Sequence, residues 1–511
     1  MNVAQEVSTT INSPSIAYSL IMPMLVVFGA AIVGVLVEAF VPARSRRLAG
    51  LAVALLGVFI ALGFVIYLAQ NLNDLKNPVA GLVARGAVAV DGPALFLQGA
   101  ILALAATALL LLGERTPADE RPAAGGQIRP VQTETFSLTM FSIGGMMLFV
   151  SAHNLIVMFI ALEILSLPLY LLCGLARRRR LISQESALKY FLLGAFSSAF
   201  FLYGLALLYG YAGSVNLTAL YDAVYEPRSN ETLLYAGLAL LAVGLLFKVG
   251  AAPFHFWTPD VYQGAPTSVT ALMAACTKVA AFGALLRVLL VPFFGLRADW
   301  RPALGAVAVL TMVVGAVIAV TQTDVKRMLA YSSVAHAGFI LTGVAASNRA
   351  GLKGSMFYLL AYGFTVIGGF AVVTLVRDGN GEASHLSQWQ GLGKRSPLVA
   401  GLFAFFLFAL AGIPLTSGFT GKFTVFEAAV EGGATYLVIV GVICSAIAAF
   451  FYARVVVLMF FQEPVADGPS VVTPPWLTSA ALGLSVFATV ALGVAPDLLL
   501  RVAGSADRFI R

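Results

Sequence analysis

Uncharged apolar runs of about 20 residues recur along the whole of this 511-residue chain. A helix of that length crosses the roughly 30 Å of hydrocarbon in a bilayer. Only 11% of the residues are charged, whereas a soluble domain carries roughly 25%. A single buried core in a soluble protein does not account for so many runs. The sequence therefore predicts an all-α membrane protein.

We expect about 14 transmembrane helices with short connections. Their predicted ranges are 16–40, 48–69, 93–113, 134–152, 154–175, 186–213, 232–256, 265–291, 301–321, 325–347, 352–377, 397–431, 434–461 and 475–500. The polar stretch Glu114–Glu134, with its glycine, proline and mixed charges, predicts a flexible loop. No basic segment precedes the first run, so we interpret that run as a mature helix and not as a cleavable signal peptide.

Lysine and arginine are unequally divided between the two sets of loops, with 15 on one side and seven on the other. The richer set is Arg44, Arg46, Arg47, Arg115, Arg121, Arg129, Arg177 to Arg180, Lys326, Arg327, Arg377, Lys394 and Arg395. The poorer set is Lys76, Arg85, Arg228, Arg297, Arg301, Arg349 and Lys353. The richer side is expected to be cytoplasmic. An even number of helices then places both termini on the outer side, and Arg177–Arg180 is interpreted as an anchor on anionic lipid.

A weak internal repeat relates two parts of the chain. The run that begins Tyr190-Phe-Leu-Leu-Gly resembles the run that begins Phe357-Tyr-Leu-Leu-Ala, and Pro253 and Pro414 interrupt hydrophobic segments at a similar separation. The shift is five helices, an odd number, so the second copy would be inverted. Inverted repeats with interrupted helices indicate a transport site near the membrane midplane. A chance similarity is the alternative.

Five ionisable residues stand out at mid-depth in different predicted spans. Each costs about 2.5–3.5 kcal/mol or more at the membrane centre, so each needs a reason to be there. A lysine near a helix end can instead extend to the interface, and a lone histidine can be a hydrogen-bonded core residue. Together they suggest a proton relay, because each can gain and lose a proton. The five are Glu163, Lys248, Lys278, His336 and Lys422.

Two prolines, Pro253 and Pro414, lie in the same predicted spans as Lys248 and Lys422. Each removes a backbone donor and disturbs the helix. Carbonyl groups freed at membrane depth must be buried in protein or line a wet cavity. Water there would link the titratable side chains, although a simple packing kink is the alternative.

The sequence contains no signal for a redox, nucleotide or metal site. It has no GxGxxG motif after a strand, no P-loop and no CxxCH motif. Its three cysteines lie in apolar runs and are predicted to be packing residues: Cys173, Cys276 and Cys444. We therefore expect no cofactor and no metal in this chain.

One long run carries a family resemblance: Phe247-Lys-Val-Gly-Ala-Ala-Pro-Phe-His-Phe-Trp-Thr-Pro-Asp-Val-Tyr-Gln-Gly-Ala-Pro-Thr267. It resembles the antiporter-like subunits of respiratory complex I, the proton-pumping NADH:quinone oxidoreductase, which share ancestry with multisubunit cation/proton antiporters. The Asp260–Pro266 ending is similar to the N branch (subunit 2 in mitochondria) and not to L or M. Lys422 also favours the N branch, because subunit M is expected to carry a glutamate at that position. The absence of the long C-terminal lateral helix that is typical of subunit L favours the N branch as well. The resemblance is strong over about 130–430.

The resemblance implies the roles of the five residues. Glu163 and Lys248 would form a pair, Lys278 would be the connecting lysine, His336 the central histidine and Lys422 the distal lysine. Lys189 and Lys353 also match positions that recur near helix ends. The implied organisation is an N-terminal three-helix segment over 1–125, an antiporter-like core over 126–462 and a C-terminal helix over 463–511. The core would hold inverted repeats at about 130–291 and 300–462.

The resemblance also implies a translocase subunit of the inner (cytoplasmic) membrane with no redox centre of its own. NADH, FMN, iron–sulfur clusters and quinone would bind to partner subunits. Its partners would be lipid and other complex I membrane subunits, including another antiporter-like subunit, and not nucleic acid. Three alternatives stay open: a cation/proton antiporter, a purely structural membrane subunit, and a subunit of a membrane hydrogenase.

Overall fold

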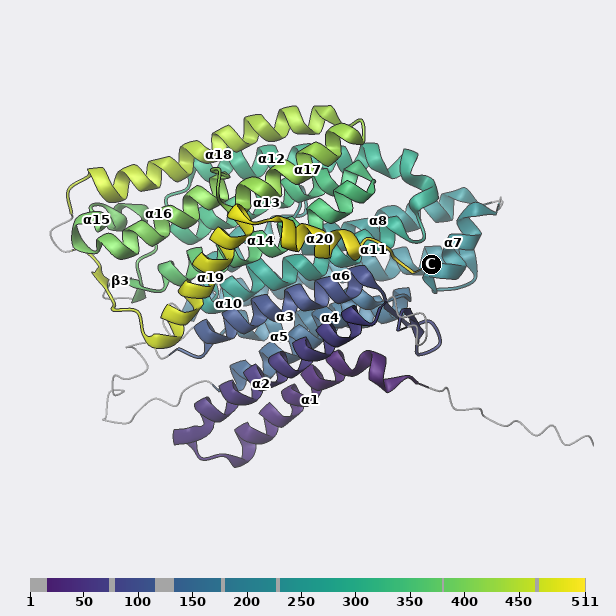
Figure 1. The fold of residues 1–511 in the computed structure, drawn as a ribbon, viewed down its shortest axis with the longest axis horizontal. Coiled ribbons are helices and arrows are strands. Elements are labelled where there is room, and N and C mark those ends of the chain that lie inside the picture. The colour runs from purple at the N-terminus through teal and green to yellow at the C-terminus, as the bar shows by residue number, and fades with distance from the viewer. Residues whose placement is uncertain are drawn as a thin grey trace, which may run out of the picture.

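The computed structural model describes residues 16–72, 79–114, 133–175, 180–226, 230–378, 381–464 and 468–510. Long helices with similar axis directions form one bundle (Figure 1). Within the described residues, 13 helices are long and apolar enough to cross a membrane. The predicted class, an all-α multi-pass membrane protein, is confirmed.

The first half of the bundle consists of α1 (Tyr18–Phe40), α2 (Ala43–Gln70), α3 (Gly92–Leu112), α4 (Glu134–Ser151), α5 (Leu155–Cys173), α6 (Arg180–Ala212), α7 (Leu217–Tyr225), α8 (Glu231–Val249), α9 (Trp257–Gly264), α10 (Thr267–Leu272), the π-helical turn η1 (Met273–Thr277) and α11 (Lys278–Leu290). The second half consists of η2 (Phe294–Leu296), α12 (Arg297–Thr321), α13 (Val325–Ala346), α14 (Arg349–Val373), η3 (Leu386–Trp389), α15 (Leu392–Arg395), α16 (Pro397–Ala411), α17 (Ser417–Glu431), α18 (Thr435–Phe461), α19 (Trp476–Val494) and α20 (Asp497–Ser505).

Two short antiparallel sheets lie in the connections. One pairs β1 (Gly81–Val83) with β2 (Val88–Val90). The other places β3 (Val376–Asp378) between β4 (Gly381–Glu382) and β5 (Ser470–Val471). The sequence did not predict these strands, because segments of two or three residues carry no periodic signal.

Both predicted interruptions are present. The predicted helix 232–256 ends at Val249, because Gly250 takes a left-handed conformation with φ 77°. The predicted helix 397–431 is divided into α16 and α17, and Gly412 at the end of α16 has φ 89°. In both cases a glycine before the proline ends the helix. The predicted spans 232–256 and 397–431 therefore ran past the ends of α8 and α16.

Other predicted boundaries also differ from the structure. The helix predicted at 186 begins at Arg180, because Ser183, Gln184 and Glu185 follow its start and hydropathy detects only the apolar part after them. The helix predicted over 475–500 is divided into α19 and α20 at Ala495–Pro496, where proline cannot continue the hydrogen-bond ladder. The short amphipathic helices α7 and α9 were predicted as connections, because neither is long enough for a span.

The most enclosed helices carry the candidate relay. The span from Thr267 to Leu290 and helix α13 are wholly buried, and α14 is almost so, whereas well under half of α1, α2, α18 and α19 is buried. Figure 1 shows α13 and α14 in the interior of the bundle and α1 and α18 at opposite edges. Lys278 and His336 therefore face protein, whereas the peripheral helices offer apolar surfaces suited to lipid or neighbouring subunits.

An ion pair inside the bundle was not foreseen from the sequence. The Arg287 guanidinium donates to both carboxylate oxygens of Asp91 at 2.8 Å, and both side chains are almost completely buried. The Ile510 amide also donates to Asp91, and Phe509 lies over the guanidinium. The end of the chain is thereby attached to the N-terminus of α3. Breaking such a buried pair by removing one partner costs about 3–5 kcal/mol.

The two ends of the bundle differ in their connections. Figure 1 places β3 and α15 at one end, and α7, the start of α1 and the C-terminus at the other. At the first end, Lys326 pairs with Glu382, and Arg395 donates to the Pro469 carbonyl. Some of the predicted charge pattern lies outside the described residues: Lys76, Arg115, Arg121, Arg129, Arg177 to Arg179, Arg228 and most of the loop predicted over Glu114–Glu134.

Candidate functional site

Lys248 lies in the last turn of α8, just before the helix is interrupted, and is only 4% exposed. Its ammonium is 5.5 Å from the centre of the Tyr170 ring and 5.0 Å from that of Tyr190. It donates a long hydrogen bond of 3.4 Å to Tyr190 Oη. Trp257 stacks on Tyr190 with 4.8 Å between ring centres. Aromatic faces thus surround the buried charge, and cation–π attraction stabilises it.

Glu163 lies on α5 and is partly buried. Its carboxylate accepts a hydrogen bond of 2.5 Å from Ser198 Oγ on α6. Glu163 and Lys248 interact electrostatically but do not form an ion pair among those found in the described residues. Aromatic side chains take the positions next to the ammonium, and the pairing of Glu163 with Lys248 stays a prediction.

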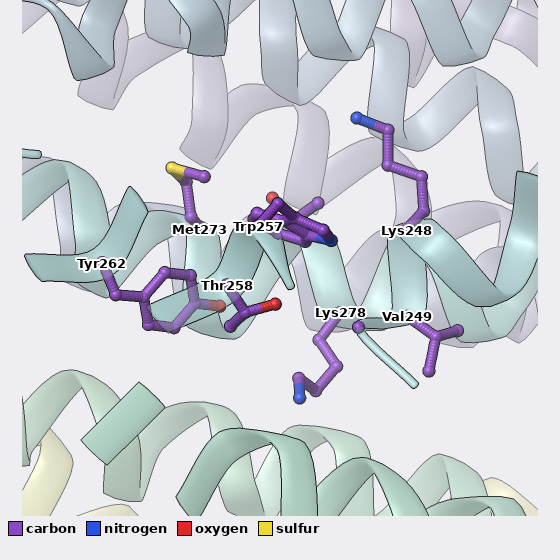
Figure 2. Close-up of a pocket in the computed structure, with 9 residues that line it drawn as sticks. Lys248, Val249, Trp257, Thr258, Tyr262, Met273 and Lys278 are labelled. Carbon is purple, nitrogen blue, oxygen red and sulfur yellow. The ribbon is translucent and has the colours of Figure 1, made fainter. Parts of the chain in front are cut away.

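A small cavity joins Lys248 to Lys278. The space between its lining atoms is about 240 Å³ with the open margin included, and the cavity itself has room for about one water molecule. The polar side chains that line it are Lys248, Thr258, Tyr262, Thr277 and Lys278. In Figure 2 the two ammonium groups point to opposite sides, and the hydroxyls of Thr258 and Tyr262 lie on the Lys278 side.

Lys278 is the first residue of α11, directly after the π-helical turn η1. It is 5% exposed, and its ammonium donates to the Ser333 carbonyl on α13 at 2.6 Å. The ammonium is also 5.4 Å from the centre of the Tyr362 ring. Single π-helical turns often occur at functional sites because they change the direction of the side chains that follow. Here the span directs Lys278 toward α13.

His336 lies one helical turn after Ser333 on α13 and is 2% exposed. Tyr358 Oη is 2.8 Å from its Nδ1 atom, and Tyr452 Oη is 3.5 Å from its Nε2 atom. The Tyr362 ring packs against the imidazole with 4.9 Å between ring centres. Both ring nitrogens thus face hydroxyl groups that can donate or accept a proton.

Lys422 lies on α17, after the interruption. Its ammonium donates to the carbonyl of Ala411, the last residue of α16, at 2.7 Å, and to Ser445 Oγ at 2.9 Å. The carbonyl is free to accept because the helix ends there, and the C-terminus of a helix attracts positive charge. Phe339, which packs against His336, has its ring centre 4.9 Å from the Lys422 ammonium.

The structure therefore brings four of the predicted residues, Lys248, Lys278, His336 and Lys422, into one buried series, and Glu163 lies at its edge. The sequence did not point to the tyrosines between them, because a tyrosine in an apolar run is not distinguishable from a packing residue. The three cysteines are buried and free, as predicted. In the part of the chain that the structure describes, no group of three or more His, Cys, Asp or Glu residues could hold a metal ion.

Lys189 takes part in a separate charge cluster at the first turn of α9. Its ammonium is 2.7 Å from Glu185 and 2.8 Å from Asp260, and Arg327 is 2.5 Å from the same aspartate. Burial opposes ionisation of Asp260, but the hydrogen bonds from Lys189 and Arg327 outweigh it and hold the pKa of Asp260 below its usual value. Lys353 lies next to Gly504 of α20, away from the relay.

A bundle with two interrupted helices and a buried series of ionisable side chains defines a membrane transport subunit. Residues 152–448 match the family described as "NADH:quinone oxidoreductase/Mrp antiporter, TM". The chain is 61% identical to NADH-quinone oxidoreductase subunit N of Parafrankia sp., covering 99% of this chain and 97% of the relative. It is 59% identical to the subunit N of Salinispora arenicola, over 98% and 99% of the two chains.

Solved structures agree. A chain of respiratory complex I from Thermus thermophilus has a TM-score of 0.77 and 34% identity, and the match covers 95% of this chain and 100% of that one. A chain of the Mrp complex from Dietzia sp. has a TM-score of 0.79, 24% identity and coverage of 95% and 97%, a likeness of fold alone. The chain belongs to the NADH:quinone oxidoreductase/Mrp antiporter family of membrane subunits.

Proposed function

We propose that the chain is the N-type, proton-translocating membrane subunit of an NADH:quinone oxidoreductase. The observation that carries the proposal is the buried series from Lys248 to Lys422, whose members are joined by a cavity, hydroxyls and ring contacts. Identity of 61% to a subunit N over almost the whole length supports the assignment to this complex. A structural subunit has no need for buried ionisable groups that are costly to insert.

In the proposed route, Lys248 takes a proton from the cytoplasmic side under the influence of Glu163. The proton passes through Lys278 and His336 to Lys422 and then leaves. A carboxylate changes how firmly a nearby lysine holds its proton, so a change in the Glu163–Lys248 distance acts as a switch. The ring contacts beside Lys248 leave room for such a change, because they fix its ammonium less tightly than an ion pair does.

Energy reaches the subunit from a distance. NADH, FMN, iron–sulfur clusters and quinone bind to other subunits, and this chain contacts lipid and further membrane subunits, including another antiporter-like one, but no nucleic acid. The chain resides in the inner (cytoplasmic) membrane with both termini on the outer side. The start of α1 and the C-terminus lie at the same end of the bundle, as a placement of both termini on one side of the membrane requires (Figure 1).

The proposed organisation keeps a three-helix segment over 1–125, a translocating core over 126–462 and a C-terminal helix over 463–511. The core contains two inverted repeats at about 130–291 and 300–462. The family match over 152–448 falls within this core. The interruptions after α8 and α16, each with a buried lysine beside it, support the repeat.

The test is the variant Lys248→Met in the assembled complex. We expect NADH-driven proton uptake into inside-out membrane vesicles to fall to the background, because the first proton acceptor is lost. Lys394→Met is the matched control, since Lys394 pairs with Glu463 at the surface and exposed pairs contribute little. A normal ratio of protons to electrons in Lys248→Met would overturn the proposal.

Purification tests the alternative complexes. A cation/proton antiporter would not bring flavin and iron–sulfur subunits with it in mild detergent, and a membrane hydrogenase would bring a hydrogenase. Buried lysines already disfavour an antiporter for Na⁺ or K⁺, because fixed positive charge repels a cation strongly where solvent is scarce.

A further inference from the structure

Three buried hydroxyl side chains lie between the cavity and His336 without a role in the route above. They belong to Tyr262 on α9, Ser333 on α13 and Tyr362 on α14, which are at most 2% exposed. Tyr262 lines the cavity together with Lys278. The Ser333 side chain lies beside both tyrosines. These residues connect the wall of the cavity to the central histidine.

The hydroxyls of Ser333 and Tyr362 are incompletely satisfied. Neither Ser333 Oγ nor Tyr362 Oη makes a hydrogen bond of normal geometry within the described residues. The hydroxyls of Thr258 and Thr277, on the cavity wall, likewise make no hydrogen bond within the described residues. Buried polar groups almost always have a partner, which is often an internal water molecule. A cluster of such groups between two ionisable residues is suited to holding water or to exchanging partners.

Tyr362 occupies the central position in this cluster. Its ring contacts the Lys278 ammonium on α11 and the His336 imidazole on α13. One turn earlier on α14, Tyr358 is hydrogen-bonded to His336 Nδ1. Lys278 and His336 have no direct hydrogen bond between them in the described part of the chain; Lys278 donates to the Ser333 carbonyl instead. A proton that moves between them needs an intermediate carrier; the Tyr362 ring contacts both residues, and its hydroxyl lies beside the Ser333 side chain.

We propose that Tyr262, Ser333 and Tyr362 form a hydroxyl bridge that carries protons from the Lys248–Lys278 cavity to His336, with Tyr362 as its central link. This inference rests on the proposed function. One proton leaves Lys278 Nζ and binds to a hydroxyl or water oxygen, and that oxygen passes its own proton onward. The last transfer, through Tyr358, delivers one proton to His336. Each hydroxyl ends with the single proton it had, and no electrons move.

The test is Tyr362→Phe in the assembled complex, measured as NADH-driven proton uptake by inside-out vesicles together with NADH oxidation. The ring and its contacts remain, and only the hydroxyl is lost. We expect proton uptake to fall about tenfold, which corresponds to roughly 1.4 kcal/mol on the barrier. Tyr211→Phe is the matched control, because Tyr211 is also buried but donates to the Ala223 carbonyl, away from the relay. Equal uptake in the two variants would overturn the bridge.

A second variant guards against failure of Tyr362→Phe to assemble. Ser333→Ala removes one oxygen from a helix and should lower uptake severalfold, whereas Ser333→Thr should restore it. Ser485→Ala is its control, because Ser485 on α19 is equally buried and equally without a hydrogen-bond partner in the described residues. If Ser333→Ala and Ser485→Ala behave alike, the bridge is wrong.

Comparison with Lys248→Met separates the two proposals. Loss of pumping in Lys248→Met with normal pumping in Tyr362→Phe and Ser333→Ala would disprove the hydroxyl bridge and leave the proposed function intact. Normal pumping in Lys248→Met would disprove the proposed function itself.

Discussion

Lys248 and Lys422 lie beside the two interrupted helices, but their ammonium groups are held differently. Lys248 has two aromatic faces and one long hydrogen bond of 3.4 Å. Lys422 donates 2.7 Å and 2.9 Å hydrogen bonds to the Ala411 carbonyl and Ser445. A hydrogen bond from a charged donor contributes about 1.5–3 kcal/mol at good geometry and weakens when it is long, whereas a desolvated cation–π contact contributes about 2 kcal/mol without fixing the ammonium on one acceptor atom. Lys248 is thus the more adjustable of the two, as a switch requires.

The difference follows from where each lysine lies relative to its interruption. Lys248 precedes the break, in the last turn of its own helix, and its ammonium donates to Tyr190 Oη and not to a carbonyl at the end of that helix. Lys422 follows the break, and the carbonyl groups at the end of α16 face it. The same kind of interruption therefore produces one loosely held and one firmly held charge.

After Lys248→Met, the variant expected to have the largest effect on proton uptake is Glu163→Gln. This change keeps the hydrogen bond from Ser198 and removes the negative charge that acts on Lys248. We expect proton uptake to fall about tenfold while the complex assembles, since the more adjustable lysine depends on this charge. Proton-to-electron ratios in vesicles measure it, with Glu134→Gln, an exposed carboxylate at the start of α4, as the control. Unchanged uptake would mean that Lys248 is not switched by Glu163.

A smaller effect is expected when one hydroxyl is removed beside each lysine. Tyr190→Phe removes the hydroxyl that accepts from Lys248, whereas Ser445→Ala leaves Lys422 its bond to the Ala411 carbonyl. We expect uptake to fall about threefold in Tyr190→Phe and less than about twofold in Ser445→Ala. The reverse order, measured in the same vesicle assay, would show that Lys422 is the more sensitive site.

The smallest effect is expected for Asp260→Asn, because Asp260 lies outside both lysine sites. It removes the partner of Lys189 and Arg327. We expect the purified complex to lose about 1 kcal/mol of stability or less, with little change in pumping.

The effect of Asp260→Asn should depend on pH in a defined way. Because the pKa of Asp260 is lowered, the contribution of its charge to stability is present above about pH 4 and is lost as the pH falls further. Thermal unfolding should therefore show a constant difference from wild type between about pH 6 and 8. A difference that vanishes in this range would contradict the interpretation.

Much of the site could be predicted from single residues. Lys248, Lys278, His336 and Lys422 were recognisable because a charged group in an apolar run is costly and easily seen. The contacts of Glu163 were not, because the distance between α5 and α8 depends on packing. The pair Asp91–Arg287 was missed for a similar reason: its members lie almost two hundred residues apart, near helix ends, where charges are common.

The sequence by itself determined that the chain crosses a membrane many times, which family it resembles and which residues carry protons in the proposal. Hydrophobic length and isolated charges are local properties, so they can be read along the chain. Only the tertiary structure decided that glycines and not prolines end α8 and α16, that aromatic rings surround Lys248, and that Tyr262, Ser333 and Tyr362 meet. The glycine helix ends depend on a local backbone conformation that the residue type alone does not fix. The ring and hydroxyl clusters depend on contacts between helices distant in sequence, and a hydroxyl in an apolar run does not reveal its neighbours.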